Sequence, residues 1–148
     1  MAFNAQGTEI FWSTSTAAST STSNMVGEIV GFTGPGGAAA EIDVTNVNSV
    51  AKEYLIGLMD YGEVSFDMNL SLTDTAQVAL RADCVAAVKS QRKCVIKFSD
   101  STTDAARTKA IFNAYGKTFS INGAVDSAVK GTLAIRVTGG VTFSSVIT

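Results

Sequence analysis

Few residues of this chain are suited to catalysis. It contains no histidine, and its two cysteines are Cys84 and Cys94. Without histidine, the common general acid–base and nucleophile–base pairs lack their usual proton carrier. Two thiols also fall short of the four ligands that a structural zinc ion takes. We therefore predict two buried free thiols and no metal site. A Cys84–Cys94 disulfide remains the alternative if the helix and strand that carry them pack closely.

The remaining polar patterns do not form a reaction centre either. Glu41 and Asp43 are two residues apart on one strand face, where they could mimic a carboxylate pair. No pocket pattern accompanies them, so we expect them to be solvated or to face a shared channel. The glycines of Gly34–Gly37 lack the residues that complete a phosphate-binding loop. No calcium-loop spacing is present, and the basic residues do not cluster with aromatics. These absences predict a protein that is not an enzyme and needs no cofactor.

Charge is distributed unevenly along the chain. Residues 1–74 hold nine acidic residues and one basic residue, a net of −8, whereas residues 75–148 hold four acidic and ten basic residues, a net of +6; together these give the overall −2. This pattern predicts one acidic and one basic surface. Copies could then stack acid against base, or an acidic sheet could face passing nucleic acid. Two ordinary solvated faces are the plainer alternative.

Length and composition favour one β-rich domain that spans residues 1–148. Only 16% of the residues are charged, which is less than the usual quarter and favours extensive contact between subunits. No run of 18 apolar residues occurs, so we expect no membrane helix and no membrane partner. Residues 13–24 are almost all Ser, Thr and Ala and predict a flexible surface loop.

The stretch from Glu41 to Leu72 is the most unusual part of the chain. Period-2 alternation predicts two half-buried strands, at 41–45 and at 63–72. Between them, residues 46–61 are too apolar for an ordinary connection of that length. We predict that this arm contacts a partner through large side chains, namely Val47, Val50, Tyr54, Leu55, Ile56, Leu58 and Met59.

The rest of the chain is predicted to form strands around one helix. We predict strands at 8–13, 25–32, 93–99, 107–122 and 132–138, with a further edge strand at 141–147. Gly116 is a candidate bulge, and Asn122-Gly123 is a hairpin turn signal. An N-cap at Thr73 or Asp74 starts a helix over 74–90, with Ala76, Leu80, Cys84, Ala87 and Val88 on its buried stripe. The predicted fold is mainly β, α+β in class, either a sandwich or a partial barrel flanked by one helix.

Several motifs together resemble one protein family. They are GEI at 27–29, GPGG followed by EIDVT over 34–45, SVAKEYLIGLMDYGE over 49–63, and KTFSING with VKGTLAIRVTGG near the end. This pattern resembles the tail tube proteins of long, non-contractile-tailed bacteriophages, over nearly the whole chain.

The resemblance implies a structural virion protein, assembled in the host cytoplasm. Six copies would form a ring, rings would stack into a tube, and strands of all copies would join into one inner β-barrel. The arm would reach a neighbouring copy, and DNA would pass through an acidic lumen without specific binding. Further partners would be the tape measure, tail tip and terminator proteins. From the alternation of side chains along the strands and from their charge, we predict that five residues face the lumen: Glu63, Asp67, Glu41, Asp43 and Glu28.

Two alternatives share parts of this pattern. A tube subunit of a secretion or contractile-injection system would have the same fold. A monomeric β-sandwich that binds a small ligand or a sugar is the other alternative.

Overall fold

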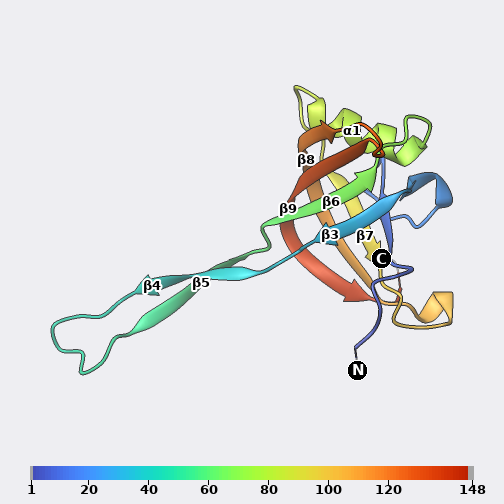
Figure 1. The fold of residues 1–148 in the computed structure, drawn as a ribbon. Coiled ribbons are helices and arrows are strands. Elements are labelled where there is room, and N and C mark those ends of the chain that lie inside the picture. The colour runs from blue at the N-terminus through green and yellow to red at the C-terminus, as the bar shows by residue number, and fades with distance from the viewer. Residues whose placement is uncertain (1, 147–148) are drawn as a thin grey trace.

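A curled seven-stranded sheet forms the body of the protein (Figure 1). The computed structural model describes residues 2–146. The strand order is β2-β1-β7-β8-β9-β6-β3, and every neighbouring pair is antiparallel. The strands are β1 (Glu9–Trp12), β2 (Met25–Val26), β3 (Ile29–Thr33), β6 (Glu63–Asn69), β7 (Arg92–Lys97), β8 (Lys109–Asn122) and β9 (Lys130–Ser144). The predicted mainly β class with one α-helix is confirmed, and its form is a partial barrel.

The two edges of this sheet lie close together because the chain passes directly from one to the other. Strand β2 is at one edge and β3 at the opposite edge, yet only Gly27 and Glu28 separate them. A three-residue step spans at most about 11 Å, so the sheet must curl until its edges nearly meet. The prediction of one strand over 25–32 is therefore wrong, because two strands, β2 and β3, occupy this segment. The break falls at Glu28, whose φ of 60° takes the chain out of the strand conformation.

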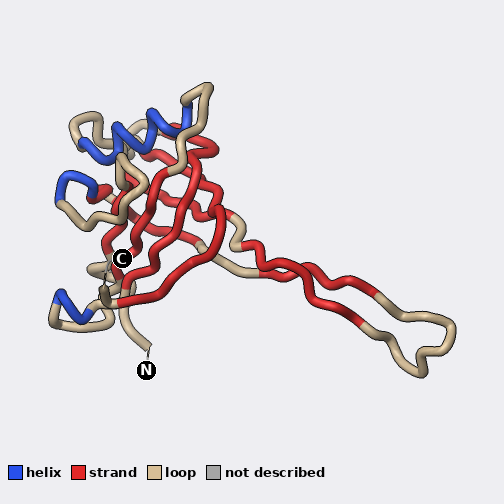
Figure 2. Tube along the Cα trace, turned by 180° about the vertical axis from the view of Figure 1, so that it is seen from behind, coloured by secondary structure: helices blue, strands red, loops and turns tan. Residues whose placement is uncertain are grey.

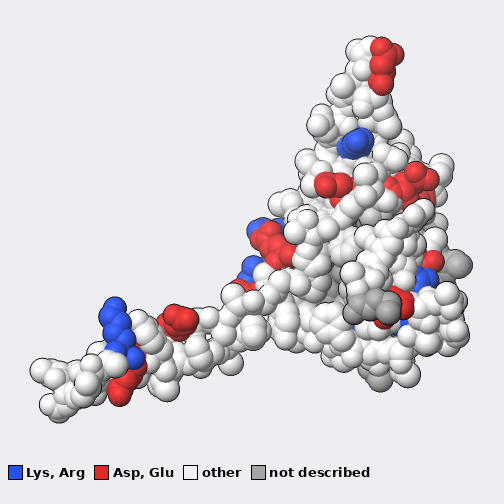
Figure 3. Space-filling model, turned by 60° about the horizontal axis from the view of Figure 1, so that its bottom comes forward, with Lys and Arg blue, Asp and Glu red and all other residues white. Residues whose placement is uncertain are grey.

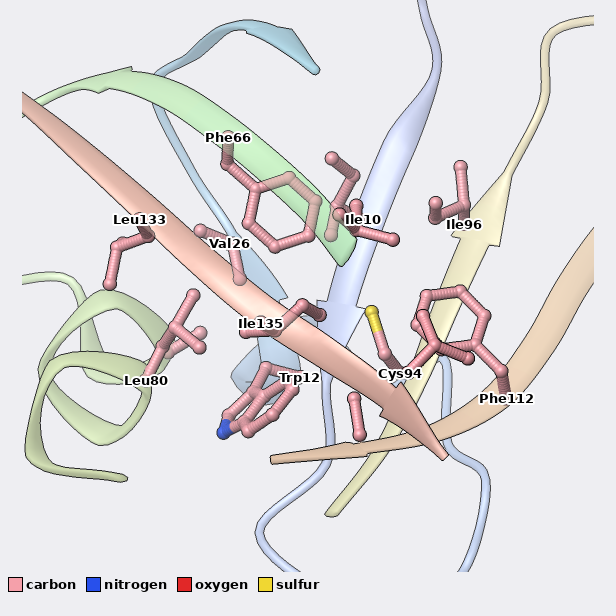
Figure 4. Packing of buried hydrophobic residues seen from close by; sticks show 14 of the residues in the cluster. Ile10, Trp12, Val26, Phe66, Leu80, Cys94, Ile96, Phe112, Leu133 and Ile135 are labelled. Atoms are coloured by element: carbon pink, nitrogen blue, oxygen red, sulfur yellow. The ribbon is translucent and has the colours of Figure 1, made fainter. Parts of the chain in front are cut away.

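The interior of the curl holds the main hydrophobic core (Figure 4). Alternate residues of the strands point into it, as the period-2 pattern requires. Trp12 and Phe66 are its largest members, and Leu80 covers it from the helix. Cys94 is wholly buried there, and Cys84 is nearly so. Both cysteines are free thiols, so the disulfide alternative is wrong and the predicted buried thiols are confirmed.

The one α-helix of the described residues, α1 (Thr75–Val85), closes the top of the core. Its N-cap is Asp74, whose side chain accepts a 2.9 Å hydrogen bond from the Gln77 amide, as predicted. It ends five residues before the predicted Ser90. The backbone leaves the helical conformation at Ala86, whose ψ is 136°, and the Lys89 side chain donates to the Cys84 carbonyl at the helix end. Ala87 and Val88 are consequently exposed, and do not extend the buried stripe.

A buried glutamine joins the start of α1 to the junction of the two sheet edges. Gln77 is 3% exposed, and its Nε2 donates to the Gly27 carbonyl at 2.7 Å and to the Asn69 carbonyl at 3.1 Å. Its Oε1 accepts from the Ser71 amide at 2.9 Å. These bonds tie β2, β3 and β6 to the helix, and so hold the curl closed.

The outer face of the sheet is covered on one half only. Phe11, Val95 and Ile111 form a second small cluster there, on the side of the sheet away from the main core. Ala18 and Met25 pack on it. The Ser/Thr/Ala segment 13–24, which includes the short 3-10 helix η1 (Thr22–Asn24), thus supplies a cover over β1, β7 and β8.

The two longest strands form the spine of the sheet. Strand β8 carries the predicted irregularity at Gly116, where the register to β9 shifts. A Cβ on Gly116 would lie 2.7 Å from the Cys84 amide nitrogen, so glycine lets α1 pack directly on the strand. Strand β9 is one continuous strand in the sheet interior, which corrects the predicted edge strand at 141–147. Ile147 lies outside the described residues.

Two smaller features complete the body. The short 3-10 helix η2 (Asp104–Ala106) lies between β7 and β8. No helix in residues 2–146 is long and apolar enough to cross a membrane.

Candidate assembly surfaces

A long hairpin projects from the body (Figures 1 and 2). It consists of β4 (Ala38–Asp43) and β5 (Tyr54–Asp60), which pair only with each other. We call residues 38–60 the arm hairpin. The prediction placed a strand at 41–45 in the body and treated 46–61 as the connection. The structure corrects this, because β4 belongs to the arm hairpin and β5 occupies most of the predicted connection.

The arm hairpin is exposed and apolar on both of its faces. Ile42 pairs with Leu55 on one face, and these side chains are 51% and 58% exposed. Ile56 and Tyr54 are on the other face, opposite Glu41 and Asp43 respectively. All seven predicted arm residues are exposed: Val47, Val50, Tyr54, Leu55, Ile56, Leu58 and Met59. Ile42 and Val44 join them, although the sequence pattern had assigned both to a half-buried strand.

Two glycines with positive φ shape the base of the arm hairpin. Gly34 has φ +93°, and a Cβ there would lie 2.5 Å from the Glu63 carbonyl oxygen. Gly62 has φ +68° and donates its amide to Asp60 at 2.9 Å. That hydrogen bond, followed by one from Arg136, holds the pKa of Asp60 below its ordinary value. The base is therefore a fixed turn that aims the arm hairpin away from the body.

The second surface is the uncovered half of the outer sheet face. It consists of alternate residues of β6, β9 and the second half of β8. Register places Ser65 beside Ala134 and Thr118, and Asp67 beside Thr132 and Ser120. We call this surface the polar face; its residues are Glu63, Ser65, Asp67, Asn69, Thr118, Ser120, Asn122, Lys130, Thr132, Ala134 and Arg136.

Ion pairs balance the charge of the polar face. Glu63 pairs with Lys117, and Arg136 pairs with Asp60 at 2.6 Å. Asp67 accepts a 3.1 Å hydrogen bond from the Thr132 hydroxyl. The cation of this face without a carboxylate partner among the described residues is Lys130. The polar face therefore presents few unpaired cations that could bind DNA phosphates.

The five residues predicted to face a lumen do not share one surface. Glu63 and Asp67 are exposed on the polar face. Glu28 lies at the junction of the two sheet edges and is exposed. Glu41 and Asp43 are on the arm hairpin, where the Thr45 hydroxyl and amide lower the pKa of Asp43. The reason for the separation is that β4 leaves the body, whereas the parity argument had assumed that it joined the same sheet as β6.

The predicted division into one acidic and one basic surface is also wrong for the body (Figure 3). Acidic strands of the first half lie beside basic strands of the second half, because β1 pairs with β7 and β6 with β9. Glu9 accordingly contacts Lys97 and Arg107. A remaining imbalance is confined to the arm hairpin, which holds four acidic residues and Lys52, a net of −3.

Neither surface offers a reaction centre. A hollow of about 600 Å³ at the base of the arm hairpin contains two carboxylates, Asp60 and Glu63, and both are engaged in ion pairs. Among residues 2–146 there is no cluster of three potential metal ligands.

Comparison with known proteins identifies the family. A family model described as "Phage tail tube, TTP, lambda-like" matches residues 1–146. The chain belongs to this family. It is a tail tube subunit, a structural component of a phage tail within the virion. A search of curated protein sequences finds no significant match.

Solved structures share the fold. The tail of an empty GTA particle, refined with C6 symmetry, superposes with a TM-score of 0.69 at 15% identity and covers 97% of this chain and 99% of that one. The SPP1 tail tube gives a TM-score of 0.66 at 12% identity over 95% and 78% of the two chains. An extracellular contractile injection system protein, from a sheath/tube terminator structure, gives 0.71 at 7% identity over 97% of each chain.

These findings separate the alternatives. The family match makes the phage tail tube the function, and tubes of contractile injection systems are related by fold. Self-association and contact with other tail proteins follow from membership in a tube. A monomeric ligand-binding module is not supported.

Proposed function

We propose that six copies of this chain form a ring, that rings stack into the tube, and that the polar face lines the lumen. The observation that carries this assignment is the uneven cover of the sheet. Segment 13–24 covers the outer face over β1, β7 and β8, whereas none of the described residues covers the polar face. In such a ring the free edge of β3 in one copy would pair with a strand edge of the next copy. This pairing removes exposed strand edges, which otherwise promote aggregation.

The chemistry of the polar face suits a channel for DNA. Serine, threonine and asparagine hydrate well, and the carboxylates of Glu63 and Asp60 occupy Lys117 and Arg136. DNA affinity depends on the number of phosphates neutralised by free cations. A wall whose cations are already paired gives the phosphates few anchors. Glu63 therefore acts by pairing Lys117, and Asp67 acts by adding negative charge to a face whose unpaired cation among the described residues is Lys130. Glu41 and Asp43 serve the arm hairpin instead.

Charge reversal on the polar face tests this role. Glu63→Lys together with Asp67→Lys adds cations and frees Lys117, so DNA should bind the wall. We expect tubes of normal length by electron microscopy, and at least a tenfold loss of infectivity with slower DNA release from particles. Each single reversal, Glu63→Lys or Asp67→Lys, is also compared with Asp126→Lys in the loop before β9, because that control reverses one charge outside the polar face. Normal DNA release from the double variant would refute the lumen assignment.

The arm hairpin supplies contacts between copies. Its large apolar side chains are exposed on both faces, and burial of such residues stabilises an interface by roughly 25 cal/mol per Å². Deleting residues 38–60, so that Gly37 joins Tyr61, should leave a folded body that forms no tubes. Circular dichroism checks the fold, and sedimentation checks assembly. Normal tubes from the deletion variant would show that the arm hairpin is not the stacking element.

The tape measure, tail tip and terminator proteins are the further partners that we propose. They would meet the subunits at the lumen and at the two ends of the tube. Co-purification of each with tubes, compared between the intact chain and the deletion variant, tests these contacts.

A further inference from the structure

One face of the arm hairpin combines acidic and apolar side chains. Glu41 lies directly opposite Ile56 and Asp43 opposite Tyr54, so these four side chains point the same way. Ile56 is 67% exposed and Tyr54 47%. Glu41 makes no ion pair with any described residue, whereas Glu63 and Asp60 are both paired within the chain. This face, which we call the acidic arm face, requires a partner that is both apolar and basic.

The outer side of α1 has that complementary chemistry. Val78 and Val85 are seven residues apart on the solvent side of the helix, and Val85 is 68% exposed. Arg81 lies between them on the same side and makes no ion pair among residues 2–146. Lys89 adds a second cation at the C-terminal end of the helix, next to exposed Val88. We call Val78, Arg81, Val85, Val88 and Lys89 the helix patch.

The helix patch and the acidic arm face of one copy cannot meet. Figures 1 and 2 show that α1 lies across the top of the body, whereas the arm hairpin projects sideways and away from it. From its base to its tip the arm hairpin is about 30 Å long, given roughly 3.3 Å per residue. A contact between the two surfaces must therefore join different copies. Because the surfaces differ, the contact is heterologous and can repeat without closing, as a growing stack requires.

We propose that the acidic arm face of one copy docks on the helix patch of another copy. This inference rests on the proposed tube function and names the surface that receives the arm hairpin. The dimensions agree. Glu41 and Asp43 are about 7 Å apart along the strand, and Arg81 and the Cys84 carbonyl that holds Lys89 are about 4.5 Å apart along the helix axis. The long side chain of Arg81 spans the difference, while Ile56 and Tyr54 cover the exposed valines.

Cross-linking in assembled tubes tests the docking directly. A double variant, Ile56→Cys with Val85→Cys, is assembled into tubes, and the preformed tubes are treated with a short bismaleimide. We expect a ladder of covalent oligomers on denaturing gels. Ile56→Cys with Val125→Cys is the matched control, because Val125, in the 123–129 loop, is more exposed than Val85 (92% against 68%) but lies outside the helix patch. Its ladder should be at least tenfold weaker. Tubes that cross-link no better through residue 85 than through residue 125 would overturn the docking.

A charge exchange supplies the second test. Glu41→Arg alone and Arg81→Glu alone should each raise the critical concentration for assembly by about tenfold, because like charges would meet at the interface. The double exchange should restore it. Glu41→Arg with Lys130→Glu is the control and should show no recovery. If the wild-type chain forms no tubes, the proposed function itself fails. If it forms tubes but the double exchange shows no recovery, only the docking is refuted.

Discussion

Replacing Gln77 by methionine is the sharpest test of how the curled sheet is held closed. Gln77→Met keeps the length of the side chain and removes both polar atoms. Three backbone groups then lose their partners, namely the carbonyls of Gly27 and Asn69 and the amide of Ser71. Each such hydrogen bond contributes about 1 kcal/mol net, so we expect a loss of about 3 kcal/mol in the free energy of unfolding. For a domain of this size the midpoint temperature should fall by roughly 6–12 °C.

Thermal unfolding of the unassembled protein, followed by circular dichroism, measures this change. Gln91→Met is the matched control, because Gln91 is half-buried and its side chain makes no hydrogen bond to any described residue. Its effect should stay within about 0.5 kcal/mol. Hydrogen exchange at the Ser71 amide should accelerate in Gln77→Met before global unfolding. A loss no greater than that of Gln91→Met would refute the role of Gln77 in joining the sheet edges.

Three further outcomes follow from the structure. Gly116→Ala should cost about 1–3 kcal/mol in thermal unfolding because its Cβ would meet the α1 backbone, whereas Gly140→Ala, with open space around it, should be neutral. A hydrogen bond from Lys97 lowers the pKa of Asp104 in the folded state. The stability that this group contributes is therefore present above the ordinary carboxyl pKa of about 4 and is lost as the pH falls through the lowered value. Asp104→Asn should accordingly reduce the loss of stability at acid pH, measured as the urea midpoint against pH. Burial raises the pKa of the Cys84 thiol to about 11, so thiol reagents at pH 8 should label it only after denaturation.

The strand pattern of the body could be predicted because its residues alternate between core and solvent. Val64, Phe66 and Met68 are buried in β6, and the residues between them are partly or fully exposed. The N-cap at Asp74 and the irregularity at Gly116 were also visible in the sequence, since each depends on local chemistry. These features need no knowledge of which strand lies next to which.

The pairing of strands could not be read in the same way. Polar and apolar residues alternate in 41–45 as clearly as in 63–69. Alternation alone does not show whether the apolar face packs on the chain's own core or on another copy. Ile42 and Val44 are exposed in the chain, so their alternation does not reflect burial in its own core. The short link at Gly27 and Glu28 is another such case, because two residues can bend one strand or pass between two sheet edges. Only the three-dimensional closure of the sheet decides between them.

The charge asymmetry of the sequence has different consequences in the body and in the arm hairpin. In the body, antiparallel pairing brings acidic and basic halves side by side, and the pairs of Glu9 with Lys97 and of Glu63 with Lys117 cancel locally. The arm hairpin has a net charge of −3 and the rest of the chain +1, since the total is −2. Because Asp60 pairs with Arg136 of the body, the unbalanced charge of the arm hairpin is −2. Charge left unbalanced on a projecting apolar hairpin repels other hairpins and attracts basic surfaces. Such a hairpin disfavours self-pairing of free arms and favours docking on a body, which is the directionality that a stacked tube requires.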